Sequence, residues 1–172
     1  FVKVFNMRYI STRGVSPALN FEEVLMAGLA TDGGLYVPES IPVFSKEEIK
    51  ALRNLKYVEV AYRVMKPFVG ETFTKSEFKS LIESAYSSFY NSDVCPLIEL
   101  SENNFLLELF HGPTLAFKDV AMQLIGKMFD NILRRRKSRA TIVAATSGDT
   151  GSAAMEAFRS SDLADVFVLF PD

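Results

Sequence analysis

The sequence predicts an α/β protein, in which a small, mostly helical N-terminal domain precedes the beginning of a parallel β-sheet. Two observations predict this arrangement. Helix-start signals dominate up to about residue 92, and short apolar segments then alternate with helical periodicity and glycine-bearing turns. The change falls around the extended Cys95-Pro96, which gives predicted domains of residues 1–92 and 93–172.

Three helix starts in the N-terminal domain are predicted by capping boxes, in which glutamate follows the N-cap residue by three positions. The pairs are Asn20 with Glu23, Ser45 with Glu48, and Thr74 with Glu77. A further helix over residues 57–66 is predicted to be stopped by Pro67, which lacks a backbone N–H donor, and by Gly70. Residues 9–12 are predicted to be extended, and Asp32-Gly33-Gly34 to form a turn.

Three apolar segments, residues 105–110, 141–145 and 166–170, are predicted to be parallel strands. A long helix over about 120–133 and a shorter one over 153–159 connect them. No helix follows the last strand, so we expect the sheet to continue in sequence absent from this chain. We also interpret residues 1–6 as a leader before Met7.

The composition excludes several classes of protein. Of the 172 residues, 48% are hydrophobic and 23% charged, with a net charge of −2, as in an ordinary soluble globular protein. No apolar run approaches the roughly 20 residues of a membrane span, and the balanced charge argues against a nucleic-acid binder. The single cysteine and single histidine cannot form a disulfide or a zinc site, and we expect a cytoplasmic protein without a metal.

Lys118 is the first candidate for chemistry. It follows Phe117 at the start of the long helix, after a predicted strand, where ligands bind in open α/β sheets. Burial and the positive end of the helix dipole both favour a neutral amine, the form that reacts with aldehydes. The alternative is a surface lysine paired with Asp119 or another carboxylate.

The second candidate is the turn between the next strand and helix. It consists of Thr146, Ser147, Gly148, Asp149, Thr150 and Gly151. Small residues, hydroxyls and exposed N–H groups at a helix start suit a carboxylate or phosphate, although an ordinary capped turn explains them as well. The Asp149 carboxylate would repel an anion unless it turns away as a cap, pairs with a cation or carries a proton.

Four stretches, residues 8–14, 32–38, 108–119 and 145–151, resemble the threonine synthase family of pyridoxal-phosphate enzymes. The resemblance runs from about Met7 to the end. It implies the tryptophan-synthase-β-like fold (fold type II), which is incomplete here, with the cofactor-phosphate loop and the pyridine-nitrogen partner downstream. The implied activity is that of a carbon–oxygen lyase acting on a phosphate ester, converting O-phospho-L-homoserine and water to L-threonine and phosphate.

The resemblance also implies residue roles. Lys118 would hold pyridoxal 5'-phosphate as an aldimine and shuttle protons, with Phe117 and Asp149 beside the cofactor. The substrate carboxylate would lie against Thr146, Ser147, Gly148, Thr150 and Gly151. We expect a monomer or homodimer without nucleic-acid or membrane partners, and no turnover from this chain alone. The alternatives are a threonine-synthase-like phospholyase of the same fold and a non-catalytic anion-binding module.

Overall fold

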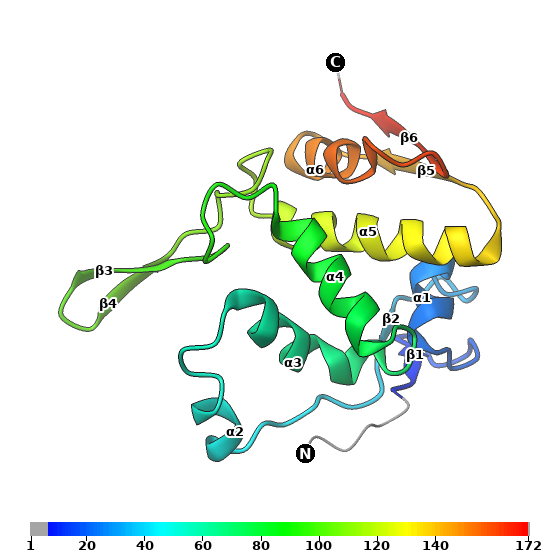
Figure 1. The fold of residues 1–172 in the computed structure, drawn as a ribbon. Coiled ribbons are helices and arrows are strands. Elements are labelled where there is room, and N and C mark those ends of the chain that lie inside the picture. Colours follow the sequence, from blue (N-terminus) through cyan, green and yellow to red (C-terminus); the bar gives the residue numbers. More distant parts are fainter. Residues whose placement is uncertain (1–6, 172) are drawn as a thin grey trace. The chain divides into compact units, whose positions relative to one another are not determined.

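The computed structural model describes residues 7–171, and the chain divides into two compact units (Figure 1). Unit 1 extends to Lys79 and unit 2 begins at Ser80, so the division falls within helix α4, Lys75–Tyr86. The domain boundary near residue 92 stays a prediction. In the described part of the chain, no helix combines the length and apolar content needed to cross a membrane.

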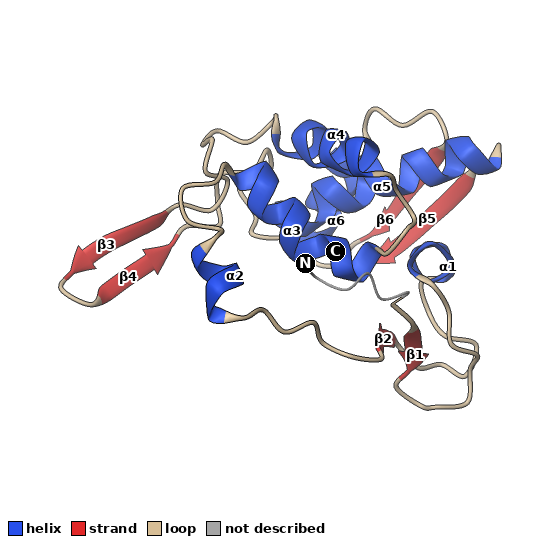
Figure 2. Ribbon diagram, turned by 60° about the horizontal axis from the view of Figure 1, so that its bottom comes forward, coloured by secondary structure: helices blue, strands red, loops and turns tan. Residues whose placement is uncertain are grey.

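Unit 1 combines a short antiparallel strand pair with helices (Figure 2). In order along the chain its elements are β1 (Tyr9–Ser11), α1 (Phe21–Ala27), β2 (Tyr36–Pro38), α2 (Lys46–Lys50), α3 (Tyr57–Val69) and the start of α4. All three predicted capping boxes are confirmed, because in each the side chains and backbone N–H groups of the N-cap and the glutamate are joined reciprocally.

Of the two predicted stops of α3, Gly70 is confirmed, because the helix ends there at a φ of 54°. The other, Pro67, is wrong, because the helix continues through it to Val69. Proline costs the helix one backbone hydrogen bond, and only Phe68 and Val69 continue the helix after it. The Lys66 ammonium donates a 2.6 Å hydrogen bond to the Gly70 carbonyl and satisfies one of the terminal acceptors.

The core of unit 1 is a chain of aromatic rings. Phe73 and Phe78, both fully buried, stack with centroids 5.8 Å apart, and Phe78 also contacts Tyr62 of α3 at 6.0 Å. On the other side Phe73 meets Phe21 of α1, which contacts Tyr9 of β1 at 6.1 Å. Aromatic pairs contribute beyond their buried area, so this chain joins β1, α1, α3 and α4 into one core.

A carboxylate fixes the loop that joins β1 to the rest of unit 1. Asp32 accepts hydrogen bonds from the Ser11 hydroxyl at 2.8 Å and from the backbone N–H groups of Val15, Ser16 and Gly34. Desolvation alone would raise the pKa of Asp32, but these hydrogen bonds outweigh it and hold the pKa well below its usual range. The predicted Asp-Gly-Gly turn is therefore joined to the loop after β1 by hydrogen bonds that the Asp32 carboxylate accepts.

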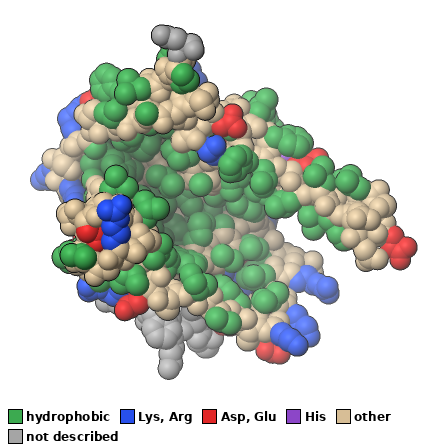
Figure 3. All heavy atoms as spheres, turned by 180° about the vertical axis from the view of Figure 1, so that it is seen from behind, with side chains coloured by type: hydrophobic (Ala, Val, Ile, Leu, Met, Phe, Trp, Pro, Cys, Tyr) green, Lys and Arg blue, Asp and Glu red, His purple; other side chains and the backbone are tan. Residues whose placement is uncertain are grey.

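Unit 2 contains an antiparallel hairpin that corrects one prediction. Strand β3 (Leu97–Ser101) pairs with β4 (Asn104–Leu107), so residues 105–110 do not form a parallel strand of the main sheet. The physical reason is the polar turn at 102–104, where Asn103 adopts a φ of 62° and lets the chain reverse. Every residue of both strands is exposed, and hydrophobic side chains line the hairpin arm in Figure 3.

The parallel sheet of unit 2, as far as residues 7–171 show it, consists of β5 (Ala140–Ala145) and β6 (Ala164–Leu169). The helices of this part are α5 (Asp119–Arg136) and α6 (Asp149–Phe158). Helix α6 begins four residues earlier than predicted, because residues 149–152 form its first turn instead of a separate loop. An α/β fold with a parallel sheet is thus confirmed.

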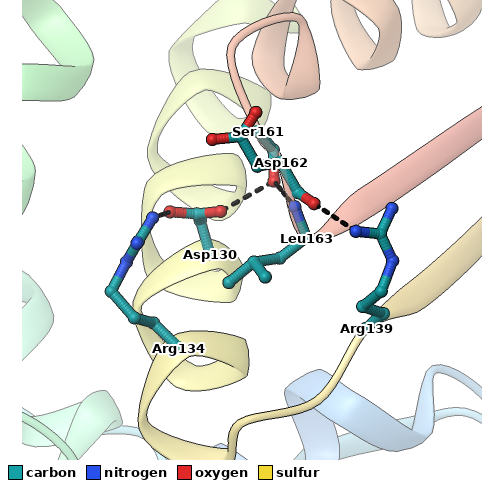
Figure 4. A network of polar contacts seen from close by, with 6 residues as sticks. All are labelled: Asp130, Arg134, Arg139, Ser161, Asp162 and Leu163. Carbon is teal, nitrogen blue, oxygen red and sulfur yellow. Dashed lines mark hydrogen bonds and ion pairs between the residues drawn. The ribbon is translucent and has the colours of Figure 1, made fainter.

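Helices α5 and α6 pack closely and in parallel. A side chain at Gly126 would lie 2.6 Å from the Ala157 carbonyl oxygen, so only glycine allows this approach. One turn further along, Asp130 accepts a 2.7 Å hydrogen bond from Ser161, within the network that also contains Arg134 and Arg139 (Figure 4). In both pairs the second residue follows the first by 31 positions, which fixes the register of the two helices.

Candidate active site

The two candidate segments lie at the same end of unit 2. Helix α5 begins at Asp119 and α6 at Asp149, and the register of their packing brings these starts level to within about one residue, or ~1.5 Å of helix rise. Strand β5 leads directly into the start of α6, so the carboxyl ends of the strands face the same way (Figure 1). Lys118 and the 146–151 turn therefore lie at the same end of the α5–α6 pair.

Lys118 is the N-cap residue of α5 and is half-buried. Its Nζ atom lies 4.6 Å from the centroid of the neighbouring Phe117 ring, and Phe117 itself is 55% exposed. Among the described residues, Nζ forms no hydrogen bond or ion pair. The alternative of a lysine paired with Asp119 is therefore not what the structure shows, and the amine is available to react.

The turn that precedes Lys118 is held in an unusual conformation. Leu115 adopts a left-handed φ of 63°, which costs a branched residue roughly 1–2 kcal/mol, and its N–H bonds the Gly112 carbonyl at 3.1 Å. His111 bonds Glu108 at 2.7 Å and stacks on Phe110, so it serves as a hydrogen-bonded turn residue. Such strain persists only where neighbouring contacts hold it, and it is frequent at functional sites.

Asp119 is the feature of this region that the sequence analysis missed. Its side chain is fully buried and accepts hydrogen bonds from the backbone N–H and hydroxyl of Thr114, both at 2.8 Å. A third bond, at 3.0 Å, comes from Gln123 one turn further along α5. The sequence does place an aspartate at the first helical position. That position alone does not indicate burial, because an aspartate is equally common at an ordinary, exposed helix start.

The 146–151 turn presents polar groups that the protein itself leaves unused. Ser147 and Asp149 are exposed and Thr150 is half-buried, and within residues 7–171 their side chains make no hydrogen bond. The N-cap is Gly148, without any side-chain cap, so the ordinary capped turn is not found. The first N–H groups of a helix lack internal acceptors, and those of α6 can bind an anion.

Thr146 and Gly151, at the two ends of the turn, are held by contacts with β6. The Thr146 N–H donates to the Leu169 carbonyl at 2.9 Å, which extends the β5–β6 ladder. Gly151 is buried, and a side chain there would lie 2.8 Å from Val168. These two residues fix the start of α6 against β6, so the turn between them has a defined shape.

Asp149 is neither a cap nor paired with a cation in the described part of the chain. A carboxylate in the first turn of a helix is favourable by itself, because it faces the positive end of the helix dipole. It would also compete with a bound anion.

An amine without a partner among the described residues and a helix start without a side-chain cap, level with each other, suit a ligand that carries both a carbonyl and an anionic group. A cofactor aldehyde with an amino-acid substrate has this chemistry. Lys118 fits the covalent attachment, and the Ser147 and Thr150 hydroxyls with the N–H groups of the turn fit a carboxylate.

Comparison with known proteins identifies similar chains. Residues 8–86 match the family model described as threonine synthase N terminus. The threonine synthase of Pseudomonas aeruginosa is 55% identical over 96% of this chain, and the chain spans 35% of that relative. Threonine synthase-like 2 of Rattus norvegicus is 41% identical over 96% of this chain and 34% of its own length.

Among solved structures, PLP-bound threonine synthase from Brucella melitensis is 55% identical, with a TM-score of 0.91, over 96% of this chain and 36% of that one. The present chain therefore spans about a third of the length of the relatives that it matches.

Proposed function

Because this chain carries the N-terminal region of the threonine synthase family, we propose that it contributes the reactive lysine and the substrate-carboxylate turn of a threonine synthase. The reaction is the conversion of O-phospho-L-homoserine and water to L-threonine and phosphate by a pyridoxal-phosphate-dependent carbon–oxygen lyase. The observation that carries the proposal is the level alignment of Lys118, whose amine is unpaired among the described residues, with the start of α6, which has no side-chain cap.

The residues present fit pyridoxal phosphate. Its aldehyde requires an amine that is not held in an ion pair by a neighbouring carboxylate. The Asp119 carboxylate accepts its hydrogen bonds from Thr114 and Gln123 instead. When bound, the cofactor supplies an electron sink for the carbon next to the substrate amine. Phe117 and Asp149 are proposed to border it, and Lys118 to attach it.

The chain's own groups then have distinct tasks. The N–H groups at the start of α6 and the Ser147 and Thr150 hydroxyls bind and orient the substrate carboxylate, with Thr146, Gly148 and Gly151 shaping the turn. The Lys118 Nζ atom takes and returns the protons that move at the substrate carbons. Orientation matters because a small misplacement of reacting groups costs a large factor in rate.

The remaining surface of unit 2 supports a larger assembly. Parallel sheets are covered on both faces, whereas here Val143 and Phe167 stay exposed on β5 and β6. We propose that polypeptide of the kind the relatives carry outside the matched third covers this face, in a cytoplasmic enzyme with a small-molecule substrate. The domains are proposed to divide near residue 92.

The test is an assay of the full-length protein with pyridoxal phosphate and O-phospho-L-homoserine. Threonine and phosphate should appear in equal amounts, and Lys118→Ala should reduce turnover at least 10³-fold, an order-of-magnitude expectation for loss of a covalent catalyst. Lys127→Ala is the matched control, since it removes a lysine of the same helix nine residues away.

A second candidate is a threonine-synthase-like phospholyase of the same fold, and the 41% identity to threonine synthase-like 2 keeps functions other than threonine synthesis open. A phospholyase would release phosphate and a ketoacid instead of threonine. Product analysis therefore separates the two functions, and absence of phosphate release with the loaded protein would overturn both.

A further inference from the structure

The buried carboxylate beside the reactive lysine has no task in the reaction proposed above. Asp119 is 0% exposed, and charged groups are almost never fully buried unless their charge is compensated. Its compensation, in the part of the chain that the structure describes, comes from the neutral donors of Thr114 and Gln123 and from the positive end of the α5 dipole. An aspartate kept in this position therefore calls for a specific reason.

The hydrogen bonds of Asp119 involve one residue before Lys118 in the sequence and one residue after it. Oδ2 accepts from the N–H and hydroxyl of Thr114, which stands four residues before the lysine. Oδ1 accepts from the Gln123 side chain, five residues after it. One carboxylate thus joins the turn that leads into Lys118 to the first two turns of α5.

The path of the turn depends on the same side chain. A Cβ atom placed on Gly112 would overlap the Cβ and carboxylate of Asp119, so the chain passes directly against it. Leu115, within the turn, is held at a φ of 63° that a free chain would leave. The carboxylate is therefore the anchor that keeps a strained turn in one conformation.

We propose that Asp119 is a positioning residue that fixes the direction in which Lys118 leaves the start of α5. The proposal rests on the proposed function, because it concerns the amine to which pyridoxal phosphate attaches. Asp119 acts through the turn and not by contact with Lys118, whose Nζ atom lies over the Phe117 ring.

A carboxylate suits this position because all three hydrogen bonds are donated to it. An asparagine offers one acceptor oxygen, and its NH₂ group would face either the Thr114 donors or Gln123, whose amide would have to turn to accept. Asp119→Asn keeps the volume but removes the charge and one of the two acceptor oxygens. Thr114→Val removes the hydroxyl donor, whereas Thr114→Ser retains it.

The experiment measures attachment of pyridoxal 5'-phosphate to the full-length protein. The apoprotein is mixed with the cofactor, samples are reduced with borohydride at set times, and the labelled lysine is located by peptide mass mapping. Attachment to Lys118 in Asp119→Asn should be about 10- to 100-fold slower than in wild type. The visible absorbance of the bound cofactor, recorded from pH 6 to pH 9, should also change its pH profile.

The matched control is Asp130→Asn, the same substitution in the second half of α5, where the charge and one of the two acceptor oxygens used by Arg134 and Ser161 are removed. It should attach the cofactor at the wild-type rate and keep its pH profile. Thr114→Val should be slowed several-fold more than Thr114→Ser, and this pair decides the question if Asp119→Asn does not fold.

Each outcome is decisive. Equal attachment rates and pH profiles in wild type and Asp119→Asn, or in Thr114→Val and Thr114→Ser, would overturn the positioning role and leave the proposed function intact. Equal slowing in Asp130→Asn would also overturn it, since the effect would then be general to α5. A wild-type protein that is labelled at another lysine would instead overturn the proposed function together with this inference.

Discussion

The two units of the chain differ in where their apolar side chains lie. In unit 1 the described aromatic residues are buried or half-buried, and Phe73 and Phe78 are 1% and 0% exposed. In unit 2 the hairpin β3–β4 is exposed throughout, and Phe167 of β6 is 58% exposed. Unit 1 also exposes aliphatic side chains, but those exposed most, such as Val15 and Val43, lie in its loops, whereas unit 2 exposes apolar side chains along its strands, a surface suited to further contacts.

Each unit also relies on one carboxylate that accepts several hydrogen bonds. Asp32 in unit 1 joins two strand-flanking loops and lies partly in solvent. Asp119 in unit 2 is fully buried and brackets a lysine. A partly exposed carboxylate stabilises a loop at low cost, but a buried one is expensive, which is why we connect only Asp119 with function.

The largest difference between the units should appear on truncation of a phenylalanine. Phe78→Ala removes a fully buried ring that contacts Phe73 and Tyr62, and we expect a loss of about 3–5 kcal/mol in the free energy of unfolding. Phe167→Ala, on the exposed face of β6, should cost at most about 0.5 kcal/mol in this chain. Urea unfolding followed by tyrosine fluorescence measures both, and equal losses would contradict the comparison.

A smaller loss is expected where α5 and α6 meet. In Gly126→Ala the new methyl group would lie 2.6 Å from the Ala157 carbonyl, so the helices must move apart at a cost of about 1–3 kcal/mol. This exceeds the gain of up to about 1 kcal/mol in helix propensity. Lys127→Ala, at the next position, should stay within about 0.5 kcal/mol of wild type. A Gly126→Ala chain as stable as wild type would show that the packing register is loose.

Local signals in the sequence were sufficient for most helices. The capping boxes work through neighbours three residues apart, and the apolar periodicity of α5 reports one buried face, so neither needs distant contacts. The common end of Lys118 and the 146–151 turn was predicted from a strand before Lys118, but in the structure it follows from the parallel packing of α5 and α6.

Two features that depend on contacts between distant residues could not be predicted from the sequence, the β3–β4 hairpin and the burial of Asp119. An apolar segment at 105–107 fits a parallel strand and a hairpin equally well, and only its pairing with 97–101 distinguishes them. The burial of Asp119 likewise depends on how the Gly112 turn folds back over α5. Residue type suggests an exposed aspartate at a helix start, and tertiary structure decides otherwise.

The smallest effect concerns Asp32 and depends on pH. Hydrogen bonds hold the pKa of Asp32 below its usual range although desolvation opposes them, so the native state binds fewer protons in acid than the unfolded state. Its contribution is therefore complete above about pH 4 and declines as the pH falls through the native pKa. Asp32→Asn should lower the urea midpoint at pH 7 and give a flatter profile towards pH 3, whereas Asp93→Asn, at an exposed site, should follow wild type. Parallel profiles for Asp32→Asn and wild type would mean that the loop of unit 1 does not depend on this charge. Asp32 could then no longer be compared with the buried Asp119 as a carboxylate that stabilises its unit.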